Sequence, residues 1–175
     1  NASAGIDDTI NLPAGIYALN DGGLGDIDIT DDLEILGAGS ATTFIDATGL
    51  GSRLFEIEGG ATVVLFSGIT MGNGSLVTSV EVEGGGIRNE GDLTPEDVVV
   101  TGNVRQGTSD EDAFGGGIWN DGFLTVDNSV ISQNLVRGDD STFDDGDDGL
   151  GGGIFNDGGT VFVIDSIITM NTAEG

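Results

Sequence analysis

The residues with the clearest chemical potential are six aspartates in the stretch 135–150. Carboxylates this close repel one another unless water, salt or a bound cation screens them. Calcium takes about six to eight hard oxygen ligands in flexible geometry, which such a stretch could supply. The spacing departs from that of an EF-hand, which needs a glutamate at the last loop position. Two interpretations therefore stay open, a calcium site and a solvated acidic loop, for Asp139, Asp140, Asp144, Asp145, Asp147 and Asp148.

Catalytic groups are harder to find. A glycosidase needs two carboxylates at a set separation, and a polysaccharide lyase needs a basic residue to abstract a proton. The chain has no histidine and no lysine, and its arginines are scattered along the sequence at positions 53, 88, 105 and 137. We therefore predict that the protein is not an enzyme. We interpret the candidate acids as a solvated outward face, namely Asp46, Glu56, Glu58, Asp127 and Asp165.

Two aromatic residues and one asparagine are candidates for surface contacts. Trp119 and Phe155 each follow an isoleucine that we expect to point inward, so alternation along a strand would turn both rings outward. Exposed rings could contact a sugar or a protein partner, and the alternative is that they pack under long loops. Asn73 begins an Asn-Gly-Ser sequon, where a secreting host that glycosylates proteins could attach a glycan.

The charge balance narrows the classes of partner. The chain has 175 residues with 31 acidic and four basic side chains, which gives a formal net charge of -27. Such a surface repels nucleic acid and anionic membranes, because binding phosphates requires Lys or Arg to displace counterions. No apolar run approaches the roughly 20 residues that span a bilayer. Cysteine is absent, so disulfides and thiol chemistry are excluded.

Internal repeats dominate the second half of the chain. The segments GGGIRNEG (84–91), GGGIWNDG (115–122) and GGGIFNDG (151–158) are nearly identical. Each precedes a β-rich run that ends in asparagine, at 93–103, 124–134 and 161–171, and a similar run covers 61–73. We align the terminal asparagines at 73, 103, 134 and 171. A constant core with linking segments of variable length indicates a solenoid.

The repeated unit is a set of short strands. Its apolar runs are rich in Val, Ile, Thr and Phe, they are bounded by Gly, Asn and Asp, and none keeps a helical period. The first third of the chain predicts further strands at 9–12, 16–19, 27–30, 33–36, 43–46 and 54–58. In the last of these, Phe55 and Ile57 would point inward, whereas Leu54, Glu56 and Glu58 would point outward.

These patterns predict an all-β, right-handed parallel β-helix that forms a single domain over residues 1–175. Equivalent side chains would stack in rows at about 4.8 Å per coil. We expect an isoleucine row of Ile87, Ile118 and Ile154. We also expect an asparagine row at a turn, in which each amide bonds the coils above and below, made of Asn89, Asn120 and Asn156.

The unit GGGI-x-N-x-G followed by LTV-x-NS-x-IS-x-N resembles the glycine-rich repeats of right-handed parallel β-helix proteins of bacterial and archaeal cell surfaces. Similar groups are the CSLREA-domain proteins and the polymorphic outer-membrane-protein adhesins, and TINLPAGIYAL and LEILGAGSATTFIDA are similar to their first coils. The resemblance implies an extracellular structural or adhesive protein.

We expect a segment or subunit of a larger surface protein or assembly. Its partners would be other copies stacked end to end into a filament, or surface glycans. The alternatives are a polysaccharide-active lyase or hydrolase and a calcium-dependent glycan-binding module.

Overall fold

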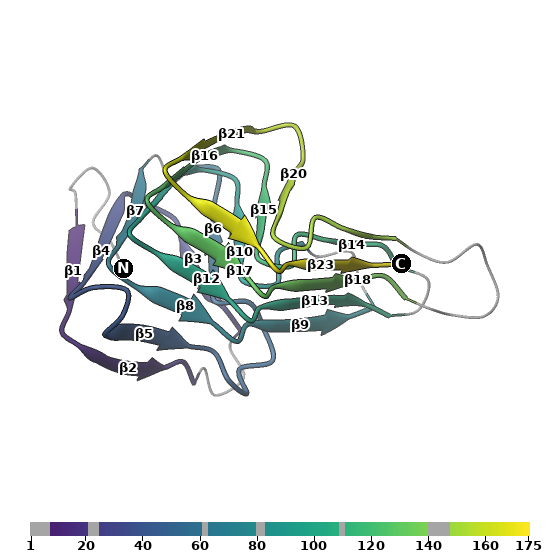
Figure 1. The fold of residues 1–175 in the computed structure, drawn as a ribbon, viewed down its shortest axis with the longest axis horizontal. Coiled ribbons are helices and arrows are strands. Elements are labelled where there is room, and N and C mark those ends of the chain that lie inside the picture. The colour runs from purple at the N-terminus through teal and green to yellow at the C-terminus, as the bar shows by residue number, and fades with distance from the viewer. Residues whose placement is uncertain (1–7, 21–24, 61–62, 80–82, 109–110, 140–147) are drawn as a thin grey trace.

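The structure, a computed structural model, describes residues 8–20, 25–60, 63–79, 83–108, 111–139 and 148–175. The regular elements in these ranges are all β-strands, and every pairing between these strands is parallel. The chain visits its sheets in the same order again and again, so that each pass lies on the previous one (Figure 1). We call each pass a tier.

Two sheets contain six strands each, one from every tier. The first sheet consists of β1 (Asp8–Leu12), β4 (Leu33–Gly37), β7 (Val64–Ser67), β11 (Asp92–Glu96), β16 (Phe123–Asp127) and β21 (Thr160–Ile164). The second sheet consists of β2 (Gly15–Ala18), β5 (Thr43–Asp46), β8 (Thr70–Gly72), β12 (Val99–Thr101), β17 (Val130–Ser132) and β22 (Ile167–Thr169).

Three smaller sheets complete the stack. The third sheet consists of β3 (Ile27–Ile29), β6 (Phe55–Ile57), β10 (Ile87–Asn89), β15 (Ile118–Asn120) and β20 (Ile154–Asn156). The fourth sheet, which extends to one side of the stack in Figure 1, consists of β9 (Ser75–Thr78), β13 (Val104–Gly107), β18 (Leu135–Arg137) and β23 (Thr172–Glu174). The fifth sheet pairs β14 (Ala113–Phe114) with β19 (Gly149–Leu150).

The strands expected in the first third of the chain are confirmed to within two residues at each end, as β1 to β6. One orientation next to β6 differs from the expectation. Phe55 and Ile57 are buried as expected, but Leu54 is buried too. Leu54 precedes the strand, and its backbone N–H donates to the carbonyl of Gly86 in the next tier. The alternation rule applies only within a strand, so it misplaced the residue at the turn.

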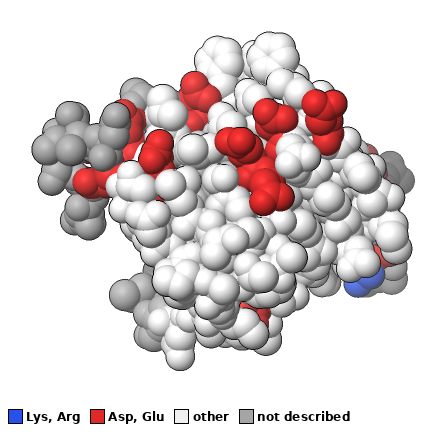
Figure 2. Space-filling model, turned by 60° about the vertical axis from the view of Figure 1, so that its left-hand side comes forward, with Lys and Arg blue, Asp and Glu red and all other residues white. Residues whose placement is uncertain are grey.

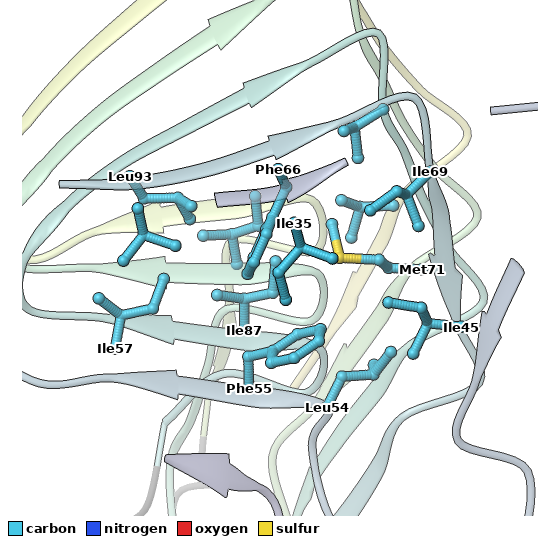
Figure 3. Close-up of a cluster of buried hydrophobic side chains, with 14 of the residues drawn as sticks. Ile35, Ile45, Leu54, Phe55, Ile57, Phe66, Ile69, Met71, Ile87 and Leu93 are labelled. Atoms are coloured by element: carbon cyan, nitrogen blue, oxygen red, sulfur yellow. The ribbon is translucent and has the colours of Figure 1, made fainter. Parts of the chain in front are cut away.

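The core lies between the first three sheets and is built from rows of apolar side chains. Figure 3 shows Ile35 and Phe66 from the first sheet, Met71 and Ile45 from the second and Phe55 and Ile87 from the third meeting in the interior. In-register pairing places like residues on like residues, as in the row of Ile87, Ile118 and Ile154. Each tier alone would leave this apolar face in water, so the tiers stabilise one another by burial.

The repeat alignment at one corner requires a correction. Thr101 pairs with Gly72, so Asn103 is equivalent to Gly74 and Asn73 is equivalent to Gly102. Asn73 therefore lies one residue before the position that we had assigned to it. The conformations agree, because Asn73 has φ 64° and Gly102 has φ 67°. The alignment by terminal asparagines failed here because Asn73 occupies the left-handed position of its tier. That position lies one residue before the one that Asn103 occupies in the next tier.

Candidate functional site

The outer face of the third sheet carries the densest set of ionic contacts. The outward row runs through Asp28, Glu56, Arg88, Trp119 and Phe155, which follow one another in register. Glu56 is the second residue of this row and accepts from Arg88 Nη1 at 2.6 Å and from Arg53 Nη2 at 2.8 Å. Two arginines that are 35 positions apart in the sequence thus share one carboxylate.

Further carboxylates surround the two guanidinium groups. Arg53 also pairs with Asp26, and Arg88 pairs with Glu90 and, at 3.2 Å, with Glu83. Burial lowers the pKa of Arg88, but the attraction of Glu90, Glu56 and Glu83 outweighs burial and raises the pKa above its ordinary value. Arg88 therefore remains charged and acts as a fixed counterion inside an acidic surface.

One carboxylate cluster in this region has the composition of a metal site. Oxygen atoms of Asp26, Asp28 and Glu56 lie within 4.8 Å of one another. Sequence reasoning missed this cluster, since Glu56 lies far along the chain from Asp26 and Asp28. Arg53 donates to two of the three residues, so it already supplies the positive charge that a cation would bring. We assign no metal to this cluster.

The aromatic end of the row is covered rather than exposed. Trp119 is only 4% exposed, and the guanidinium carbon of Arg88 lies 5.0 Å from its ring centroid. The ring of Phe155 lies 4.9 Å from that of Phe114 in β14. Of the two interpretations left open for Trp119, a partner contact and a covered ring, this burial favours the covered ring. Both rings lie in the outward row of the sheet, where Arg88 contacts Trp119 and Phe114 packs against Phe155. A contact through half-buried Phe155 stays a prediction.

The acidic loop proposed for calcium lies mostly outside the described residues. Asp140, Asp144, Asp145 and Asp147 belong to that part, whereas Asp139 is half-buried and Asp148 is exposed. The backbone N–H of Asp148 donates to Asp112 Oδ1 at 2.7 Å. Two acidic loops of successive tiers therefore end side by side, just before β14 and β19, and calcium binding stays a prediction.

Two rows of asparagines run along the stack. Asn89 Nδ2 donates to Asn120 Oδ1 at 2.6 Å, and Asn120 Nδ2 donates to Asn156 Oδ1 at 2.7 Å, in the order that the repeat predicts. A second row, which we did not propose from the sequence, links Asn103, Asn134 and Asn171 through hydrogen bonds of 3.0 Å between their side-chain amides. Its signal was present, since each β-rich run ends in asparagine. Both rows satisfy backbone groups at buried corners.

The remaining predicted residues occupy the outer face of the stack. Asp46 and Asn73 meet there, with Asn73 Nδ2 donating to Asp46 Oδ1 at 2.9 Å. Asn73 is exposed, which leaves its sequon accessible. Glu58 and Asp165 are exposed, and Asp127 is half-buried beside Glu96 in the outward row of the first sheet. The described structure does not join these acids into one site.

Both ends of the stack expose core positions. In the last tier Val163 is 48% exposed, whereas Val126, which precedes it in the same row, is fully buried. In the first tier Ile10 is 45% exposed, whereas its neighbour Ile35 is buried. An apolar cavity of about 240 Å³ opens there, and it is lined by residues that include Leu12, Tyr17 and Leu19. Among the residues that the structure describes, core positions are therefore exposed at both ends of the stack.

No family model, no curated protein and no solved structure matches the chain. Within the described residues, no helix has the length and apolar character needed to cross a membrane. The function of the chain is therefore inferred from its own geometry.

Proposed function

We propose that this protein is a right-handed parallel β-helix that serves as a structural and adhesive module at a cell surface or in an extracellular matrix. We further propose that its two open ends take up further tiers from other copies of the chain. The parallel stack supports the right-handed β-helix, because crossovers between parallel strands in one sheet are right-handed in about 98% of cases.

The observation that carries the assembly proposal is the exposure of core rows at both ends. Val163 and Ile168 continue rows that are fully buried one tier earlier, and Ile10 and Ile27 continue such rows at the other end. A strand edge with unpaired N–H and C=O groups is a template for pairing with another chain. Repeated head-to-tail pairing through one interface produces an open filament.

The acidic surface determines where copies of the protein could touch. Figure 2 shows acidic side chains gathered in the upper part of one face, with a broad uncharged area below them. The net charge of -27 keeps folded copies apart in solution. Association would therefore depend on the open ends and on the ionic conditions, rather than on nonspecific adhesion between the sides of the stacks.

Electron microscopy of the purified protein at low micromolar concentration, first with calcium and then with a chelator, tests the proposal. We expect uniform filaments with the width of one stack. Their loss on chelation would assign a binding role to the loop Asp139–Asp148. Single short particles under both conditions would overturn the assembly proposal.

Two variants of one strand separate end pairing from general charge effects. Ile168→Asp places a carboxylate in the open core row of β22, and Thr169→Asp places the same charge on the outward face next to it. We expect the first variant to abolish filaments and the second to retain them. Equal loss in both would count against pairing through the core rows.

No specific observation among the described residues favours the alternative that the protein is a polysaccharide-active enzyme. Asp46 accepts bonds from Thr48 and Asn73, which lower its pKa and keep it ionised, whereas a general acid must hold a proton. An assay for reducing or unsaturated sugars released from acidic and neutral polysaccharides tests this alternative directly. Turnover by the purified chain would overturn the structural assignment.

A further inference from the structure

We propose that the outer face of the second sheet binds a neutral oligosaccharide, anchored in a hollow between β5 and β12. This inference gives a ligand class to the adhesive role and rests on that part of the proposed function. It is independent of the open ends, because the residues concerned point sideways from the stack.

The hollow has a volume of about 280 Å³, and its lining includes Ile16, Phe44, Asp46 and Asn73. Its shape follows from one residue in the outward row. Asp46 and Thr101 flank Gly72 in register, so the row lacks a side chain between them. A Cβ at Gly72 would lie 2.6 Å from the carbonyl oxygen of Thr101, so the close approach of the two strands requires glycine there.

The polar rim of the hollow is held in place. Asp46 Oδ1 accepts from the N–H of Thr48 at 3.0 Å, from its hydroxyl at 2.6 Å and from Asn73 Nδ2 at 2.9 Å. Within the described residues, no hydrogen bond involves Asp46 Oδ2. A fixed carboxylate oxygen beside a fixed amide offers an acceptor and a donor to neighbouring hydroxyl groups, and adjacent hydroxyls of a sugar ring match that pair.

The floor of the hollow is apolar and continues along the stack. Phe44 is 36% exposed, and Ile16 beside it is exposed even more. The same outward row continues through Thr70, Val99, Val130 and Ile167. An exposed aromatic ring with a few polar groups at its edge suits the apolar C–H face of a sugar. The continuing row would let further sugar rings lie along the tiers.

The charge of the protein selects a neutral ligand. Asp46 is ionised at neutral pH and the chain carries a net charge of -27, so a uronic acid or a sulfated sugar would be repelled. A quaternary ammonium ion would be attracted, but sites for such ions surround the cation with several aromatic rings. Among the described residues, Phe44 is the one aromatic side chain that lines this hollow.

Isothermal titration calorimetry with hexasaccharides of β-1,4-linked glucose, xylose and mannose tests the inference, with a chelator present throughout. The protein should be produced in a host that does not glycosylate asparagine, because a glycan on Asn73 would cover the rim. We expect binding of at least one hexasaccharide, about tenfold weakened by Phe44→Ala and several-fold weakened by Asp46→Asn. Phe123→Ala, which removes a 58% exposed ring from the first sheet, is the matched control and should leave binding unchanged.

Several outcomes would overturn the inference. These are absence of binding to all three hexasaccharides, equal binding by the Phe44→Ala variant with native circular dichroism, or binding of tetramethylammonium but of no sugar. The end-blocked variant Ile168→Asp separates the two proposals. Sugar binding by this variant supports the hollow whether or not the wild type forms filaments, and filaments of a wild type that binds no sugar leave the assembly proposal standing.

Discussion

At the scale of single residues, the corners of the stack depend on backbone conformations that few side chains favour. One corner is left-handed in four successive tiers, at Asn73, Gly102, Gln133 and Met170, with φ between 56° and 67°. A left-handed conformation costs a residue with a Cβ about 1–2 kcal/mol. Stacking on the neighbouring tiers must offset that cost at Gln133 and Met170.

Replacing Gln133 with glycine tests this account. We expect Gln133→Gly to raise the free energy of unfolding by up to about 1 kcal/mol, because relief of the left-handed strain exceeds the entropy cost of an added glycine. Ser132→Gly, one residue earlier in β17, should lower it by about 0.5–1 kcal/mol. Urea denaturation of both variants measures the difference, and a loss of stability in Gln133→Gly would contradict the prediction.

Asparagine side-chain amides at buried corners also stabilise the stack. Asn120 is fully buried, accepts from Asn89 and donates to Asn156 and to the carbonyl of Gly122 at 3.1 Å. We expect Asn120→Ala to lower the free energy of unfolding by about 2–4 kcal/mol, since it removes the three hydrogen bonds of a fully buried amide and leaves empty space at its position. Asn156→Ala, at the exposed end of the row, is the control and should cost about 1 kcal/mol or less. Equal costs in denaturant titrations would rule out a special role for the buried position.

At the scale of elements, the outer row of the third sheet holds neighbouring tiers together through charge. Its side chains change from acidic at Asp28 and Glu56 to cationic at Arg88 and aromatic at Trp119. Glu56 of β6 thus pairs with an opposite charge on β10, and Arg88 of β10 in turn lies over the ring of Trp119 on β15. Such pairing favours one stacking order of the tiers over alternatives, because a shifted register would place like charges together.

Glu56 is the residue on which this network converges. We expect Glu56→Gln to lower the free energy of unfolding by about 1–3 kcal/mol, because Arg53 and Arg88 lose a shared counterion in a partly buried site. Glu58→Gln, exposed just after β6, removes the same charge and should change it by less than about 0.5 kcal/mol. Thermal or urea denaturation gives the comparison, and equal effects would mean that net charge rather than pairing is responsible.

At the scale of the whole molecule, attraction at the ends competes with repulsion between acidic surfaces. The apolar end positions favour association, whereas a charge of -27 on each copy opposes it. Salt shifts this balance, because the screening length falls from about 10 Å at 0.1 M to about 3 Å at 1 M.

Filament formation should therefore increase with sodium chloride. We expect longer filaments in light scattering and electron microscopy as the salt concentration rises from about 0.05 to 1 M, with no need for a divalent ion. Ile168→Asp should stay unassembled at every salt concentration, since screening does not restore an apolar end. Filaments that dissolve as salt is added would show that ionic contacts hold the copies together.

The sequence by itself determined the strands, their parallel stacking and the order of one asparagine row. These features repeat with each unit, so a local pattern of apolar, glycine and asparagine residues contains them. Only the tertiary structure decided that Arg53 and Arg88 share Glu56, that Trp119 is covered, and that Asp46 and Asn73 border a hollow. The physical reason is the variable length of the segments between strands, which sets the register and coverage of side chains that lie on different tiers.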